Sequence, residues 1–214
     1  YTNADTATVS TYHYNYDVLG NMVKDVREQI ANVEWTVTGK IKKIVRTSAS
    51  TKEDLEFKYD AFGNRIIKIV KPHGSSIENG GTNNTAVWTY TYYSRDAQGN
   101  VMSVYSGTGS SDLNLKEQDV YGSTRMGMVQ VNENMLTASQ PGPESTRDLG
   151  EKSYESTNHL GNVLVSLADR RLYVDNNSDN VVDYYTADVM TTNDYYSFGA
   201  PMPGRTFTSS NYRY

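Results

Sequence analysis

Oxygen-bearing side chains recur at regular spacing between residues 175 and 183, where they could hold a metal ion. Asp175, Asn177, Asp179 and Asp183 take positions 1, 3, 5 and 9 of this acidic stretch. A chain wrapped around a hard cation such as Ca2+ points alternate side chains inward, and the main-chain carbonyl of Val181 at position 7 can join them. The spacing therefore makes calcium a candidate ligand of this loop.

Two positions in the stretch depart from the best-known calcium loops. Thr186 stands where an EF-hand carries its bidentate glutamate, so a complete EF-hand is excluded and any affinity would be modest. Asn180 takes the tight-turn position usually held by glycine, which asparagine can fill because it tolerates positive φ. The same residues could also form a solvated acidic turn, and the sequence leaves both interpretations open.

The sequence offers few residues that could form a catalytic site. It has three histidines, His13, His73 and His159, which lie far apart in the sequence, and it has no cysteine. A zinc site or a Ser-His-Asp triad therefore has little support. His159 lies in a turn-like segment, where a structural role explains it. We expect a protein that is not an enzyme, with no cofactor apart from the calcium considered above.

A short frame, aromatic-Asp-x-x-Gly-Asn, recurs along the chain and must set the positions of the other elements. Seven segments keep all or part of it: 16–21, 35–40, 59–64, 95–100, 119–123, 158–162 and 195–199. In the sixth segment an asparagine replaces the aspartate, and the second and seventh are weaker copies with Thr36 and Tyr196 in that place. A recurrence of this kind indicates a repeat array.

Each frame has the chemistry of a β-hairpin turn. An aspartate or asparagine at the first turn position accepts a hydrogen bond from a main-chain N–H two residues on. A glycine three residues later supplies the positive φ that closes a type I turn with a G1 bulge. The residues expected in these roles are Asp17, Gly20, Asp60, Gly63, Asp96, Gly99, Asp119, Gly122, Asn158, Gly161 and Gly199.

The composition favours a β-sheet with solvent-exposed faces over a fold with a large hydrophobic core. Only 37% of the residues are apolar, 18 are tyrosine, and the mean hydropathy is −0.65. Tyrosine, threonine and valine suit pleated, half-exposed surfaces. The net charge of −5 offers no basic footprint for nucleic acid, and no apolar run is long enough for a membrane-spanning helix. The basic residues Lys40, Lys42, Lys43 and Arg46 are interpreted as a solvated strand face.

The recurring frame closely resembles the tyrosine-aspartate (YD) repeat of the Rhs (rearrangement hot spot) proteins. The segments 157–164 (TNHLGNVL) and 194–199 (DYYSFG) resemble the Rhs-associated core. The resemblance covers roughly the whole chain. It implies an all-β fold in which antiparallel β-hairpins form a curved sheet strip, part of a hollow shell that encloses or displays a variable C-terminal segment, often a toxin.

Three regions are expected. Residues 1–131 form the YD-repeat hairpin array, 132–150 an exposed irregular loop, and 151–214 core-like hairpins that carry the acidic loop 175–183. The resemblance implies a structural segment of a larger secreted or cell-surface bacterial protein of the polymorphic toxin type. Its partners would be the remainder of its own polypeptide and the secretion machinery, without nucleic acid or membrane insertion.

One alternative stays open: a surface adhesin or carbohydrate-binding repeat array. Exposed aromatic rings would then stack on sugars. This alternative predicts a groove with Trp35 or Trp88 exposed beside acids and amides.

Overall fold

The computed structural model describes residues 13–137 and 148–210, and their regular secondary structure is almost entirely β-strand. Their strands are β1 (Tyr14–Tyr16), β2 (Met22–Asp25), β3 (Ile30–Trp35), β4 (Ile41–Arg46), β5 (Asp54–Tyr59), β6 (Arg65–Lys71), β7 (Thr89–Arg95), β8 (Val101–Thr108), β9 (Asn114–Tyr121), β10 (Arg125–Asn134), β11 (Lys152–Thr157), β12 (Val163–Val174), β13 (Tyr184–Tyr195) and β14 (Pro201–Thr208). Three short 3-10 turns, η1 (Ile77–Asn79), η2 (Thr85–Val87) and η3 (Ser197–Gly199), complete the list. No helix in this part of the chain has the length and apolar character to span a membrane.

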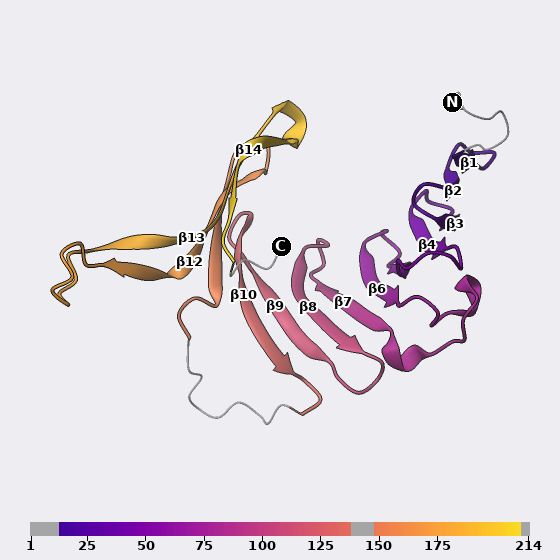
Figure 1. The fold of residues 1–214 in the computed structure, drawn as a ribbon, viewed down its shortest axis with the longest axis horizontal. Coiled ribbons are helices and arrows are strands. Elements are labelled where there is room, and N and C mark those ends of the chain that lie inside the picture. The colour runs from indigo at the N-terminus through magenta and orange to yellow at the C-terminus, as the bar shows by residue number, and fades with distance from the viewer. Residues whose placement is uncertain (1–12, 138–147, 211–214) are drawn as a thin grey trace. The chain divides into compact units, whose positions relative to one another are not determined.

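The fourteen strands form one open antiparallel sheet, and their order in the sheet is their order in the chain (Figure 1). Each strand therefore pairs with its neighbours in sequence, as expected when short turns join consecutive strands. The predicted all-β architecture of antiparallel hairpins is confirmed.

The chain divides into two compact units. In the described residues, unit 1 comprises 13–115 and 134–137, and unit 2 comprises 116–133 and 148–210. The division falls inside β9, between Leu115 and Lys116. The expected boundary near 131 stays a prediction. Residues 132–134 of the expected loop belong to β10, because the strand continues to Asn134. The central part of that loop, 138–147, lies outside the described residues.

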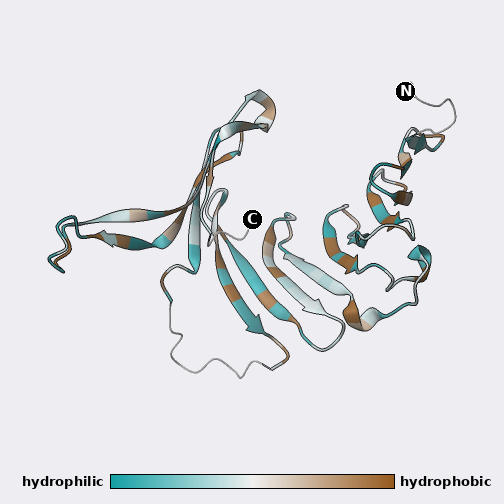
Figure 2. Ribbon diagram, in the orientation of Figure 1, coloured by the Kyte–Doolittle hydropathy of each residue, from teal (hydrophilic) through white to brown (hydrophobic). Residues whose placement is uncertain are grey.

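Each unit has a thin core. Unit 1 buries Ile30, Val33, Val45, Phe57, Ile69, Val104 and Leu115, and unit 2 buries Met128 and Met190. Figure 2 shows apolar and polar residues interspersed along the strands, without a continuous apolar layer. Backbone pairing and many small contacts must therefore stabilise the sheet, as the tyrosine-rich composition suggests.

A polar layer supports the middle of unit 1, where residues 72–88 leave the sheet between β6 and β7. Lys71, which is 4% exposed, binds Glu56 with 2.8 Å between Nζ and Oε2. Its Nζ also lies 4.3 Å from the centre of the Trp88 ring. Glu78, in η1, lies 3.7 Å from the same Nζ, so one buried cation ties the excursion to the sheet.

Unit 2 carries a two-stranded arm formed by the distal parts of β12 and β13 (Figure 1). The proximal part of β12 also pairs with β11, and the proximal part of β13 with β14. Beyond an irregularity in the register, residues 171–174 pair only with 184–187. The ion pair of Arg170 with Asp188 marks this irregularity. The arm ends in the acidic loop 175–183.

Candidate functional site

The hairpin turns repeat one hydrogen-bonding scheme, seen clearly at 60–64. The Asp60 carbonyl accepts the N–H of Gly63 at 3.0 Å, and its Oδ1 accepts the N–H groups of Phe62 at 2.9 Å and Asn64 at 2.8 Å. Gly63 has φ 81°, the left-handed conformation that glycine adopts without a Cβ penalty. The same side-chain and main-chain bonds recur around Asp17, Asp96 and Asn158, with Gly20, Gly99 and Gly161 at positive φ.

The two weak copies keep the main-chain part of the scheme. Gly39 donates to the Thr36 carbonyl at 3.0 Å, and Gly199 donates to the Tyr196 carbonyl at 3.1 Å. Both glycines have positive φ. Thr36 also accepts the Lys40 N–H through its hydroxyl oxygen at 3.0 Å. A hydroxyl can therefore replace the carboxylate, and the turn at Tyr196 forms without either group.

An asparagine four residues after the aspartate adds a side-chain bond that the turn pattern alone does not predict. Asn21, Asn64 and Asn100 each donate a side-chain N–H to the second carboxylate oxygen of the turn aspartate, at 2.9, 3.0 and 2.8 Å. These amide donors lower the pKa of Asp17 and Asp96 more than any other contact. Desolvation raises the pKa of Asp60, but the Asn64 amide and the turn N–H groups outweigh it, so this pKa is lowered too.

The frame at 119–123 does not form the predicted turn. Strand β9 runs to Tyr121, Gly122 is absent from the positive-φ residues, and its N–H donates to the Thr124 carbonyl. The Asp119 carboxylate binds Arg125, with 3.0 Å between Oδ1 and Nε. Desolvation raises the pKa of Asp119 in spite of this cation. Asp119 and Gly122 therefore do not have the roles expected of them.

The acidic loop closes on itself through its own main-chain N–H groups. Asp175 accepts from Asn180 at 2.9 Å, Asp179 accepts from Val181 at 2.7 Å, and Asp183 accepts from the N–H of Asn176 at 2.8 Å. In the described ranges no group of three or more His, Cys, Asp or Glu side chains is arranged to hold a metal ion. The loop is thus a turn closed by its own hydrogen bonds. Calcium binding stays a prediction for the five proposed ligands, Asp175, Asn177, Asp179, Val181 and Asp183.

The three histidines lie on separate segments. His13 precedes β1, His73 lies in the 72–88 excursion, and His159 lies in the 158–161 turn. They come from different parts of the sheet order and do not form a histidine cluster. The absence of enzymatic activity stays a prediction.

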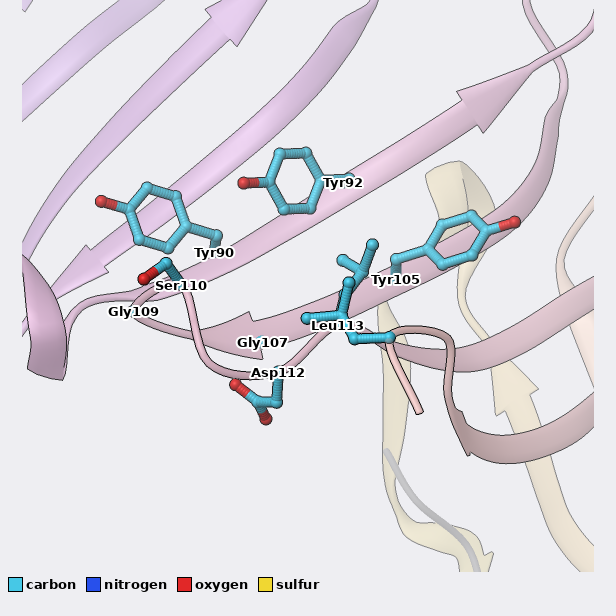
Figure 3. Close-up of a pocket in the computed structure, with 9 residues that line it drawn as sticks. Tyr90, Tyr92, Tyr105, Gly107, Gly109, Ser110, Asp112 and Leu113 are labelled. Atoms are coloured by element: carbon cyan, nitrogen blue, oxygen red, sulfur yellow. The ribbon is translucent and has the colours of Figure 1, made fainter. Parts of the chain in front are cut away.

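A groove of about 400 Å³ lies over the β7–β8 hairpin of unit 1 (Figure 3). Tyr90 and Tyr92 lie on one face of β7, and Tyr105 lies opposite Tyr92 on β8. The rings of Tyr90 and Tyr92 are nearly parallel, with 6.3 Å between centroids and 13° between planes. Leu113 and Leu136 add apolar surface to the lining.

Glycines and one aspartate shape the loop that borders this groove. Gly107 lies opposite Tyr90, and a Cβ there would come within 2.1 Å of the Asp112 carbonyl oxygen. The Asp112 carboxylate accepts the Thr108 N–H at 2.6 Å and the Asn114 side-chain amide at 2.8 Å. Figure 3 shows this carboxylate directed away from the tyrosine rings. Asp112 therefore holds the loop in place and leaves the binding surface to the rings.

The groove lining combines aromatic ring faces with hydroxyl groups. Desolvation, followed by the neighbouring Tyr92 and Glu56, raises the pKa of Tyr90, so its hydroxyl stays protonated at neutral pH and can donate and accept hydrogen bonds. Ring faces beside hydroxyl groups suit ligands that have apolar faces and polar edges.

The two tryptophans, which the carbohydrate-binding alternative places as exposed rings in a groove, instead make hydrogen bonds within the fold. Trp35 is half-buried and its indole N–H donates to the Met22 carbonyl at 2.9 Å. Trp88 is also half-buried, and it donates to the Ser75 carbonyl at 2.9 Å beneath Lys71. Both anchor the fold, and the tyrosines line the groove. The alternation of Tyr90 and Tyr92 was visible in the sequence, whereas the approach of Leu136 depends on tertiary structure.

No protein-family model matches this chain, and no curated protein matches it.

Proposed function

We propose that this chain is a structural, non-enzymatic segment of a larger secreted or cell-surface bacterial protein of the Rhs type. The recurrence of one turn, held by Asp17, Asp60, Asp96 and Asn158, supports the proposal. Because the strands follow chain order, each hairpin adds to the sheet without rearranging those before it. Such a strip suits a wall that encloses or displays a variable C-terminal segment, often a toxin.

Protease protection in the longer polypeptide tests this proposal. A segment that follows the sheet strip should resist a nonspecific protease while attached and become susceptible when expressed alone. The matched control is the same polypeptide with a cleavage site introduced before the segment, which tests whether protection outlasts the covalent link. Equal cleavage of the attached and isolated segments would contradict an enclosing role.

The tyrosine groove favours a second candidate function, the binding of a neutral oligosaccharide. Tyr90, Tyr92 and Tyr105 present ring faces with hydroxyl groups beside them, which match the apolar faces and hydroxyl edges of a pyranose ring. Most of the lining is uncharged, with Asp112 engaged in its own loop. This surface would make the array an adhesin.

Calorimetric titration with cellohexaose and mannohexaose tests this second function. Tyr92→Ala should weaken binding about fivefold, since one stacking contact contributes about 1 kcal/mol. Tyr93→Ala is the matched control, because its side chain points to the opposite face of β7. The sugar hypothesis fails if neither oligosaccharide binds the intact chain, or if both variants lose binding equally.

A further inference from the structure

A second groove, of about 350 Å³, lies in unit 1 where the ends of three hairpins meet. Three cationic side chains line it, together with Tyr59, Asn64 and Tyr93. Lys40 follows the 36–39 turn, Arg65 follows the 60–63 turn, and Arg95 precedes the 96–99 turn. The repeat therefore brings one basic residue from each of three hairpins to the same place.

Aromatic rings and carbonyl groups hold these three cations in position. The Lys40 Nζ lies 5.7 Å from the Tyr59 ring centre, and the Arg65 guanidinium lies 4.5 Å from the Phe57 ring centre. Arg95 donates through Nη1 to the Gly99 carbonyl at 2.6 Å and through Nε and Nη2 to the Arg65 carbonyl, each at 3.1 Å. Cations fixed in this way lose little conformational entropy when an anion binds.

The groove has an uncompensated positive charge. No carboxylate lines it, and Lys40, Arg65 and Arg95 form no ion pair within residues 13–137 and 148–210. Arg95 lies near enough to Asp60 to help lower the pKa of that carboxyl group, but the Asp60 oxygens already accept the turn N–H groups. Lys43 and Lys71 of the same unit, by contrast, bind glutamates.

Apolar turn tips flank the basic groove. Val37, in the turn before Lys40, and Phe62, in the turn before Arg65, are both almost fully exposed, Phe62 at 91%. A ligand that matches this surface needs clustered carboxylates beside apolar side chains. Such a pattern combines charge complementarity with hydrophobic contact.

We propose that the acidic loop 175–183 of a second copy of this chain occupies the basic groove. The loop carries Asp175, Asp179 and Asp183 without any basic residue, so its charge is opposite to that of the groove. Val181 and Val182 are exposed beside the aspartates, at 62% and 41%. The loop also sits at the end of a two-stranded arm, and among residues 13–137 and 148–210 no other strand pairs with this arm, which leaves the loop free to enter a groove.

Each copy offers one loop and one groove. A single loop-in-groove contact links two copies head to tail, whereas two copies that exchange loops form a closed dimer with two such contacts. A tip-in-groove contact is small, so we expect weak association. Because charge drives it, the association should weaken steeply as the salt concentration rises.

Charge variants and their mixture test the proposal by sedimentation velocity at low salt. The groove variant Lys40→Glu/Arg65→Glu and the loop variant Asp175→Asn/Asp179→Asn/Asp183→Asn should each self-associate at least about tenfold more weakly than the wild type. Asparagine keeps a side-chain acceptor for the loop N–H groups, as Asn158 does in its own turn. An equimolar mixture of the two variants should form a 1:1 dimer and nothing larger, because only one intact loop and one intact groove remain.

Two controls keep the result interpretable. Lys24→Glu/Lys58→Glu makes the same charge change as the groove variant at exposed positions outside the groove, and should associate like the wild type. Lys40→Glu alone covers the case in which the double variant misfolds, and should weaken association in the same direction. A wild-type chain that stays monomeric at low salt and high concentration, or a variant mixture that stays monomeric, would overturn the proposal.

Discussion

A single side-chain acceptor organises each regular hairpin turn. The Oδ1 atom of Asp17, Asp60 or Asp96 accepts two main-chain N–H groups, and the other oxygen accepts the amide of the following asparagine. Asn158 makes the same two main-chain bonds without a charge. The chain thus contains both a pH-sensitive and a pH-insensitive form of one turn.

This difference predicts acid sensitivity. The pKa values of Asp17, Asp60 and Asp96 are lowered in the folded state, so their stabilising effect is complete above the ordinary carboxyl pKa of 3.8 and is lost as the pH falls through the lower folded values. The variant Asp17→Asn/Asp60→Asn/Asp96→Asn should therefore unfold with a flatter pH dependence below pH 4, measured by urea titration. A slope unchanged from wild type would mean that other carboxylates control acid unfolding.

Gly63 gives the sharpest test of the turn backbone. Gly63→Val should lower the free energy of unfolding by about 1–3 kcal/mol, because a branched residue is strained at φ 81°. Gly122→Ala is the matched control, since Gly122 is not among the positive-φ glycines and its new Cβ would meet only the flexible Met126 side chain. We expect a cost within about 0.5 kcal/mol for the control. Similar costs in both variants would refute the strain argument.

The turns also show how well the local sequence pattern predicts hairpin turns. The frames at 17, 60, 96 and 158 have an asparagine four residues on, and all four form the turn. The frame at 119 has Ser123 in that place, and Arg125 takes the Asp119 carboxylate. The pattern of aspartate and glycine alone was therefore an incomplete rule at 119. An asparagine in the fifth place is not required either, because the turns at 36–39 and 196–199 form with Lys40 and Ala200 there.

At the scale of elements, the 72–88 excursion depends on contacts that no local pattern reveals. Lys71 binds Glu56, fifteen positions earlier by residue number, and lies against Trp88. The sequence indicated a loop from composition alone. Its partners on β5 and β6 could not be inferred, because they follow from the packing of the excursion on the sheet. The same holds for the basic groove, in which Lys40 was interpreted as part of a solvated strand face and Arg65 and Arg95 were not singled out.

Removing the buried cation should be costly. Lys71→Met leaves Glu56 without its closest cation, and we expect a loss of about 2–3 kcal/mol, less than for a fully buried pair because Glu56 keeps some exposure. Adding Glu56→Leu should recover much of that loss. Lys52→Met, which breaks an exposed pair with Glu28, should cost no more than about 1 kcal/mol. Additive effects of the Lys71 and Glu56 changes in urea unfolding would argue against coupling.

The acidic loop makes a separate prediction about ligands. If calcium binds at 175–183, a concentration ten times its dissociation constant should stabilise the wild type by about 1.4 kcal/mol and raise its melting midpoint. Asp179→Ala should remove this response, because it deletes one of the carboxylate ligands. Thermal melts in calcium and in a chelator decide the matter. Equal midpoints for the wild type under both conditions would leave a solvated turn closed by its own N–H groups.

At the scale of the whole molecule, the strand order limits how stability is shared. In the part of the chain that the structure describes, every strand pairs only with its neighbours in sequence, and the buried side chains are spread thinly along both units. In such an array stability is close to a sum of local terms and nearest-neighbour interfaces. The sequence predicted this serial order, since a repeated turn signal leaves little choice of partner. It did not predict the division inside β9.

Serial order predicts a gradient of hydrogen exchange. Amide protection should be greatest in β5 to β8 of unit 1, where each strand has two neighbours and Phe57, Ile69 and Val104 are buried. It should be least in β1 and β14, which have one neighbour each among the strands that the structure describes. Gly20→Val strains only the first turn, so it should speed exchange in β1 and β2 while leaving β6 to β8 unchanged. A uniform loss of protection across all strands of unit 1 would instead mean that this unit opens as one cooperative body.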